Sequence, residues 1–94
     1  MTQSKMKVVN LESNKGNKIA NQFEICTDEG RYFQSYDSVI AFIPYRDGKI
    51  KLDSTYWDYS KTTGKYRNIF LGEDKKTTEK KIQSGEYELC DLNS

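Results

Sequence analysis

In the first half of the chain, apolar side chains recur at every second position, and turn-forming residues interrupt them at short intervals. In the run 19–26, Phe23 and Ile25 alternate with polar residues, which is the spacing of a strand with one buried face. The group 28–30, Asp-Glu-Gly, predicts a hairpin turn that needs positive φ, and residues 31–34 then predict the returning strand.

The next run, Val39–Ile43, is apolar without alternation. A short run of this kind, bounded by polar residues and Pro44, predicts a central strand that is covered on both sides. The sequence Arg-Asp-Gly-Lys at residues 46–49 predicts a second hairpin turn. Residues 50–53 then alternate as a strand with one exposed face, and residues 6–11 predict a further strand near the N-terminus.

Beyond residue 53 the apolar period changes from that of a strand to that of a helix. Tyr66, Ile69 and Phe70 fall at positions i, i+3 and i+4, so they predict one apolar face of a helix over residues 62–71. Ser and Thr residues before it provide N-cap oxygens, and Gly72 is in the position of a C-terminal stop.

A second, weaker helix is predicted from Thr77 or Thr78 to Ser84, and a last strand is predicted within residues 86–92. Together these elements predict a single α+β domain over residues 1–94. Its fold is a small antiparallel sheet of about five strands, arranged as a hairpin meander, with one or two short helices of the C-terminal half packed on it.

Composition narrows the classes of function. The 94 residues include 15 Lys and Arg, 14 Asp and Glu and no His, so the net charge is +1. Without His, a nucleophile elbow, a phosphate-binding loop or a paired-carboxylate motif, the sequence predicts no enzyme, no catalytic residues, no metal and no cofactor. Cys26 and Cys90 are expected to be half-buried thiols in a reducing compartment.

The residues that favour a binding role lie around the start of the predicted helix. Tyrosine concentrates binding energy at interfaces, and cations near a helix N-terminus attract anionic groups. The predicted contacts are Tyr56, Tyr59, Lys61, Lys65 and Arg67, with the hairpin residues Asp47 and Gly48 as a second contact. Trp57 is open to two interpretations, a core residue or an exposed contact.

Two motifs in this part of the chain resemble a family of small proteins of phages and mobile elements in Gram-positive bacteria. The matching residues are Phe33-x-Ser35-Tyr36-x-Ser38-x-Ile40-Ala41 and Tyr59-Ser60-x-Thr62-Thr63-x-Lys65. The resemblance covers about residues 20–72. It implies a mobile-element accessory protein of the bacterial cytoplasm and does not imply an activity.

Three functions follow as expectations. The first is a non-enzymatic binding module that inhibits a host or defence protein, for example an anti-CRISPR protein that blocks a CRISPR nuclease. The second is a nucleic-acid-binding accessory protein that uses the basic segment 61–82, where seven Lys and Arg stand against three Asp and Glu. The third is a homo-oligomerising structural protein. No run approaches the roughly 20 apolar residues of a membrane span, and no signal-peptide core follows Met1, so the cytoplasm is the expected location.

Overall fold

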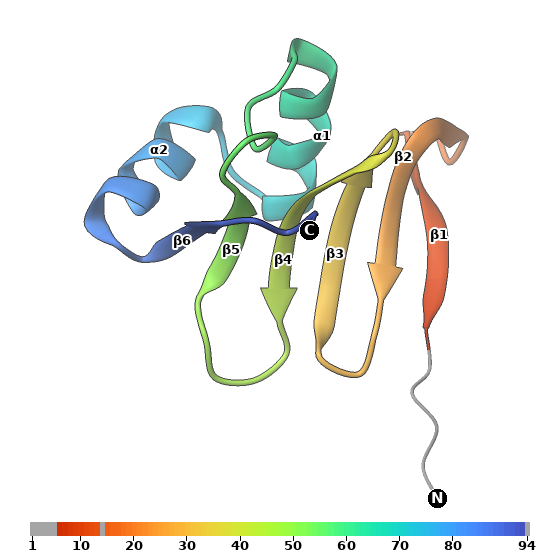
Figure 1. Ribbon diagram of the computed structural model, residues 1–94. Coiled ribbons are helices and arrows are strands. Elements are labelled where there is room, and N and C mark those ends of the chain that lie inside the picture. The colour runs from red at the N-terminus through yellow and green to blue at the C-terminus, as the bar shows by residue number, and fades with distance from the viewer. Residues whose placement is uncertain (1–5, 14, 94) are drawn as a thin grey trace, which may run out of the picture.

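The computed structural model describes residues 6–13 and 15–93. Within these residues a sheet of six strands runs in sequence order, and two helices follow its fifth strand (Figure 1). The strands are β1 (Lys7–Glu12), β2 (Lys18–Cys26), β3 (Gly30–Ser35), β4 (Ser38–Pro44), β5 (Ile50–Asp53) and β6 (Tyr87–Cys90). The predicted α+β fold is therefore confirmed, with six strands where about five were expected.

The last pair of strands departs from the predicted antiparallel meander. Strands β1 to β5 pair antiparallel with their neighbours, whereas β6 pairs parallel with β5. The chain leaves β5, passes through both helices and returns to the starting end of β5, and such a crossover gives parallel strands. The two edges of the sheet are β1 and β6.

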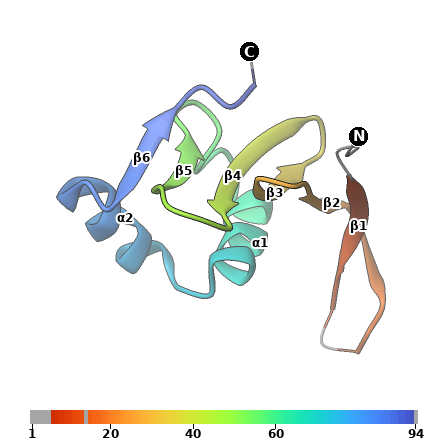
Figure 2. The same ribbon diagram turned by 90° about the horizontal axis from the view of Figure 1, so that it is seen from below.

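Each helix begins at a side-chain cap and ends at a left-handed glycine. Helix α1 (Lys61–Leu71) begins where the Ser60 hydroxyl accepts a hydrogen bond from the amide of Thr63, and it ends at Gly72. Helix α2 (Lys75–Ser84) begins two residues before the predicted Thr77, because Asp74 is the residue that caps it. Both helices lie on the same side of the sheet (Figure 2).

The hydrophobic core lies between the sheet and these helices. Phe33 on β3 stacks on Phe70 of α1 with ring centroids 5.7 Å apart, and Leu52 on β5 is fully buried. The predicted apolar face of α1 is wrong at Ile69, which is 56% exposed. Two of the four buried residues of α1 are polar, Thr63 and Arg67, and the other two are Gly64 and Phe70.

Gly48 and Gly30 are needed for different reasons, Gly48 for its backbone conformation and Gly30 for the space that it leaves. Gly48, in the predicted β4–β5 turn, has φ 134°, a conformation that favours glycine. The positive φ predicted around Gly30 is wrong, because none of residues 28–30 adopts one. A side chain at Gly30 would instead overlap the carbonyl oxygen of Ile43 and lie 2.7 Å from the ring of Phe42. Gly30 therefore provides space for β4.

Candidate binding surfaces

The start of α1 is built around one buried arginine. The side chain of Arg67 is 1% exposed. Its Nη1 donates to the carbonyl of Trp57 at 2.7 Å and to Asp58 at 3.2 Å, and its Nη2 donates to the side chain of Asn68 at 2.9 Å. The guanidinium also lies 5.1 Å from the ring of Trp57. Arg67 therefore fastens the loop before α1 to the helix.

Asp58 links this arginine to the second helix. Its other carboxylate oxygen, Oδ2, forms an ion pair with Nζ of Lys75, the first residue of α2, at 2.7 Å. Burial alone would raise the pKa of Asp58, but the hydrogen bonds from Lys75 and Arg67 lower it below its usual value of 3.8. The carboxylate is therefore charged at neutral pH and links α1, through Arg67, to the start of α2.

The other residues predicted near α1 remain at the surface and lie close to one another. Tyr59 is 65% exposed, and its ring meets Tyr56 edge to face at 5.6 Å. Lys61 and Lys65 are exposed on the first two turns of α1. The prediction of Arg67 as a surface contact does not fit its burial, since its charge is used inside the protein. Trp57, left open by the sequence, is half-buried and packs against the core.

A basic hollow of about 480 Å³ opens beside these lysines. Cations outnumber acids around it, since Asp58 is the only carboxylate among the described residues that line it. Arg67 borders the hollow, and Gly64 contributes no side chain to fill it. The lining residues are Asp58, Ser60, Lys61, Gly64, Lys65, Arg67, Asn68 and Lys75.

The second surface is the side of the sheet that carries neither of the two described helices, and most of its residues are not among the contacts predicted from the sequence. Phe33 points toward α1, so its neighbour Tyr32 points to the opposite side. The strand registers then align one transverse row: Val8 opposite Ile25, Ile25 opposite Tyr32, Tyr32 opposite Phe42 and Phe42 opposite Lys51. We call Val8, Ile25, Tyr32 and Phe42 the open-face row.

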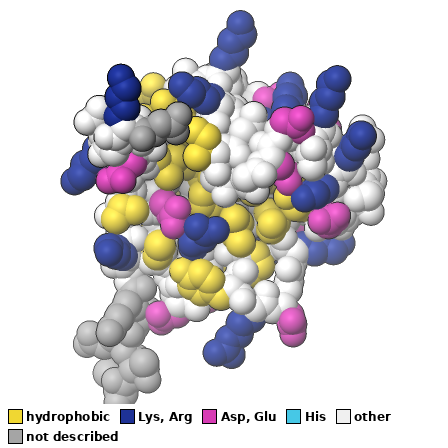
Figure 3. Space-filling view, turned by 180° about the vertical axis from the view of Figure 1, so that it is seen from behind, with side chains coloured by type: hydrophobic (Ala, Val, Ile, Leu, Met, Phe, Trp, Pro, Cys, Tyr) yellow, Lys and Arg dark blue, Asp and Glu magenta, His cyan; other side chains and the backbone are white. Residues whose placement is uncertain are grey.

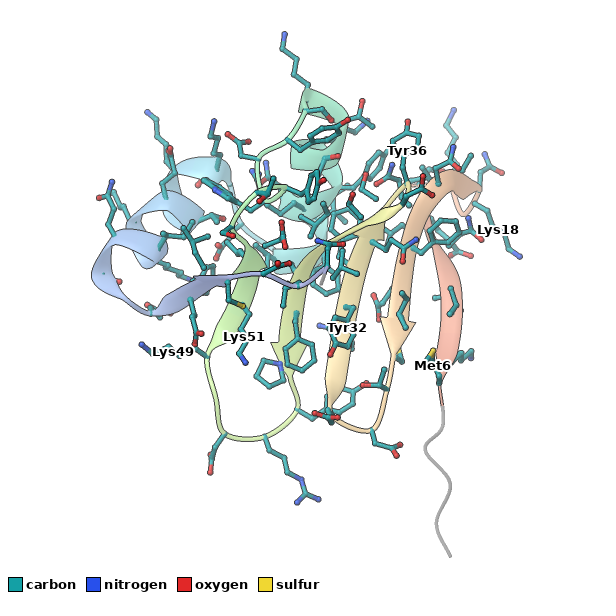
Figure 4. The ribbon with its side chains drawn as sticks, in the orientation of Figure 1. Met6, Lys18, Tyr32, Tyr36, Lys49 and Lys51 are labelled. Carbon is teal, nitrogen blue, oxygen red and sulfur yellow. The ribbon has the colours of Figure 1, made fainter. Side chains whose placement is uncertain are left out.

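The open-face row is apolar although neither α1 nor α2, the helices of the described residues, covers it. The rings of Tyr32 and Phe42 contact each other with centroids 4.4 Å apart, and Val8 is 53% exposed on the edge strand. Figure 4 looks onto this side and labels Tyr32 on β3 and Lys51 on β5, with β4 between them, and Met6 beside the β1 edge. The prediction that β4 is covered on both sides is therefore wrong around Phe42.

A hollow of about 410 Å³ adjoins the row at the β4–β5 hairpin. Phe42 and Pro44 give it an apolar wall, and Asp47 and Gly48, the predicted second contact, belong to its rim. Its charged lining residues are balanced in sign: Asp28, Glu29 and Asp47 against Arg46, Lys49 and Lys51. The structure thus places this hairpin beside the open-face row and not beside Tyr59.

The opposite end of the open face is closed by the C-terminal tail. Asp53, 1% exposed, accepts hydrogen bonds from the amides of Tyr56 and Leu92 and from the side chain of Asn93. Burial alone would raise the pKa of Asp53, but these hydrogen bonds lower it below 3.8. The Asn93 side chain also bonds both backbone groups of Val39. The tail therefore covers β4 at Val39 and leaves Phe42 uncovered.

On the helix side, apolar side chains are visible among the charged ones where the helices do not reach (Figure 3).

Glu73, between the helices, accepts hydrogen bonds from Thr78, Lys81 and Tyr87 at 2.6 to 2.9 Å. All these partners lie within the protein, so Glu73 joins α2 to β6 as a structural anchor. Over residues 6–13 and 15–93, no three His, Cys, Asp or Glu side chains gather as a metal site would require.

The architecture and surfaces define a small α+β domain with a helical layer on one side of its sheet and an open apolar row on the other. The chain belongs to a family of unknown function, DUF8033, whose model matches residues 6–86. No curated protein and no solved structure matches the chain. None of the described helices is both long and apolar enough to cross a membrane.

Proposed function

We propose that this chain is a non-enzymatic binding module of a phage or mobile element, and that it inhibits a host or defence protein by occupying a functional surface of that protein. The open-face row is its contact surface. The observation that carries the proposal is the row itself: four apolar side chains in register across four strands, with no helix over them.

The chemistry of this surface favours a protein partner over a polyanion. Tight protein interfaces place aromatic and aliphatic side chains at the centre and charged groups at the rim. The Tyr32–Phe42 pair supplies such a centre, and the adjoining hollow supplies a rim with three acidic and three basic residues. A balanced rim attracts a partner with charges of both signs, whereas a nucleic acid would require an excess of cations.

The test compares two double variants in a host lysate. Val8→Glu with Tyr32→Ser places a charge and removes a ring on the open face. Val9→Glu with Tyr36→Ser makes the same chemical changes at exposed positions outside the row, because Val9 points to the other side of β1 and Tyr36 lies in the β3–β4 turn. We expect the tagged wild type and the Val9/Tyr36 variant to retain one host protein after nuclease treatment and in high salt, and the Val8/Tyr32 variant to lose it.

Inhibition is then measured on the retained host protein, with and without the tagged chain. Equal retention by both double variants would contradict the assignment of the row, and retention without any loss of the host protein's activity would contradict inhibition. Light scattering of the purified chain adds a third check. If the Val8/Tyr32 variant converts a stable dimer to a monomer, the row serves self-association and the proposal is wrong.

A further inference from the structure

Two hollows of different chemistry are both lined by residues of the segment 58–61. The basic hollow takes Asp58, Ser60 and Lys61 from this segment. The other, of about 280 Å³, is lined by Tyr59 and by the turn between β3 and β4, that is, Ser35, Tyr36, Asp37 and Ser38. An aromatic hollow and a cationic hollow therefore share one short segment of the chain.

The aromatic hollow presents two exposed rings. Tyr59 is 65% exposed and Tyr36 is 50% exposed. Tyr56 supports Tyr59 through an edge-to-face contact at 5.6 Å, and the amide of Tyr36 is fixed by a 2.7 Å hydrogen bond to the carbonyl of Asn21. Both ring positions are thus held by the fold while the rings stay accessible. Exposed rings with fixed backbones are suited to stacking on a flat ligand.

In the part of the chain that the structure describes, the cations that line the basic hollow outnumber its one carboxylate, so the hollow carries a net positive charge. Asp58 compensates Arg67 and Lys75, with which it forms ion pairs. Lys61 forms no ion pair among the described residues, and the Lys65 ammonium lies over the ring of Tyr66 at 5.3 Å. The first turn of α1 contains no acidic residue, so its free amides add to the positive potential.

A buried guanidinium borders this hollow. Arg67, 1% exposed, borders the hollow, and its Nε has no hydrogen-bond partner although the two Nη atoms do. A buried N–H without an acceptor is costly, and the positive field of the guanidinium to which it belongs favours an anion in the hollow. The missing side chain at Gly64 keeps the approach open.

We propose that this end of the molecule binds single-stranded nucleic acid, with a base stacked on Tyr59 and Tyr36 and a neighbouring phosphate held by Lys61 and Lys65. The flat, uncharged base suits the aromatic hollow, and the phosphate suits the cationic one. A duplex does not fit this chemistry, because its bases are already stacked on one another. The site extends the proposed function to a second ligand at the end of the sheet where Figure 4 labels Tyr36, away from Lys49 at the β4–β5 hairpin.

The test measures the fluorescence anisotropy of a labelled single strand of roughly 10 nucleotides, which is within the usual site size. The main variant is Lys61→Glu with Lys65→Glu. Its matched control, Lys7→Glu with Lys49→Glu, changes the net charge equally at exposed lysines that do not line either hollow. For stacking, Tyr59→Ala is compared with Tyr45→Ala, an exposed tyrosine elsewhere.

We expect the Lys61/Lys65 variant to weaken binding at least tenfold and to flatten the dependence of log affinity on log salt by about 0.7 for each lost phosphate contact. Tyr59→Ala should weaken binding by about fivefold or more, because stacking of one base contributes that much. The two controls should bind as the wild type does.

Equal losses in the Lys61/Lys65 variant and its control would overturn the proposal, since the attraction would then be a property of net charge alone. Equal affinity for a duplex of the same length would overturn the single-strand assignment. The Val8/Tyr32 variant of the open face is included as well. Because it leaves both hollows intact, it should bind the strand normally even if the proposed inhibition fails, so the two proposals fail separately.

Discussion

The buried face of α1 and the open face of the sheet invert the usual distribution of polarity. The helix buries Thr63 and Arg67 among hydrogen bonds, whereas the sheet leaves Val8, Tyr32 and Phe42 without a covering layer. Both arrangements have a cost, one in desolvation of polar groups and the other in exposure of apolar surface. The difference indicates that the first region maintains the fold and the second is kept available for a partner.

This division can be tested because the two regions share no side chain. Substitutions in the buried polar face should change stability, and substitutions in the open face should change binding. The first of these is expected to have the largest effect.

Replacing Arg67 with Met should destabilise the protein by about 2 to 3 kcal/mol. The change removes the donors to the Trp57 carbonyl and Asn68 and leaves Asp58 with Lys75 as its ion-pair partner. The value is at the low end for a broken buried pair, because Asp58 is 34% exposed and can be rehydrated. Urea unfolding at neutral pH measures the loss.

Lys65→Met is the control for this substitution, since Lys65 is exposed on the same helix. Its effect should stay within about 0.5 kcal/mol. If Arg67→Met were as mild as Lys65→Met, the buried arginine would not be what fastens the loop to α1.

Local signals were enough to predict much of the fold. The strand around Phe23 and Ile25, the cap at the start of α1 and the stop at Gly72 all depend on neighbours within a few residues, and the structure contains each of them. The buried face expected from Phe23 and Ile25 is wrong, because Ile25 lies in the open-face row and the buried residue of this stretch is Gln22. The parallel pairing of β6 could not be read in this way, because strand direction depends on the path taken by both helices.

The sites were less predictable, for a related reason. Arg67 is recognisable as buried only when the Trp57 carbonyl and Asp58, contributed from another part of the chain, are known to surround it. The apolar run that contains Phe42 does not by itself indicate whether one face or both faces of β4 are covered, because a covered and an uncovered strand can have the same sequence. Tyr59, Lys61 and Lys65 are neighbours in sequence, so their position at the start of α1 could be read from local order, and their role as contacts stays a prediction.

A second change in the buried polar layer should have the opposite sign. Gln22 on β2 is 1% exposed, and neither its amide nitrogen nor its amide oxygen has a hydrogen-bond partner. Gln22→Met keeps the approximate shape and removes the desolvated amide, so it should raise the free energy of unfolding by about 1 kcal/mol. Thermal unfolding of the two proteins side by side measures the gain.

Gln34→Met provides the comparison, because the Gln34 amide donates to the carbonyl of Tyr36 at 2.7 Å. The same substitution there should give no gain. If Gln22→Met instead lowers the free energy of unfolding, the Gln22 amide makes favourable hydrogen bonds inside the protein. The prediction that this amide destabilises the fold would then be wrong.

The smallest change in stability is expected on the open face. Val8→Thr keeps a β-branched side chain of the same shape on β1 and replaces one methyl group with a hydroxyl. Since Val8 is 53% exposed on an edge strand, the free energy of unfolding should change by less than about 0.5 kcal/mol. Affinity for a protein bound over the row should fall about threefold to fivefold, because burying the hydroxyl forfeits the gain of burying a methyl group. Val9→Thr, on the other side of the same strand, should change neither quantity, and a loss of stability at Val8 alone would show that the row belongs to the fold and not to an interface.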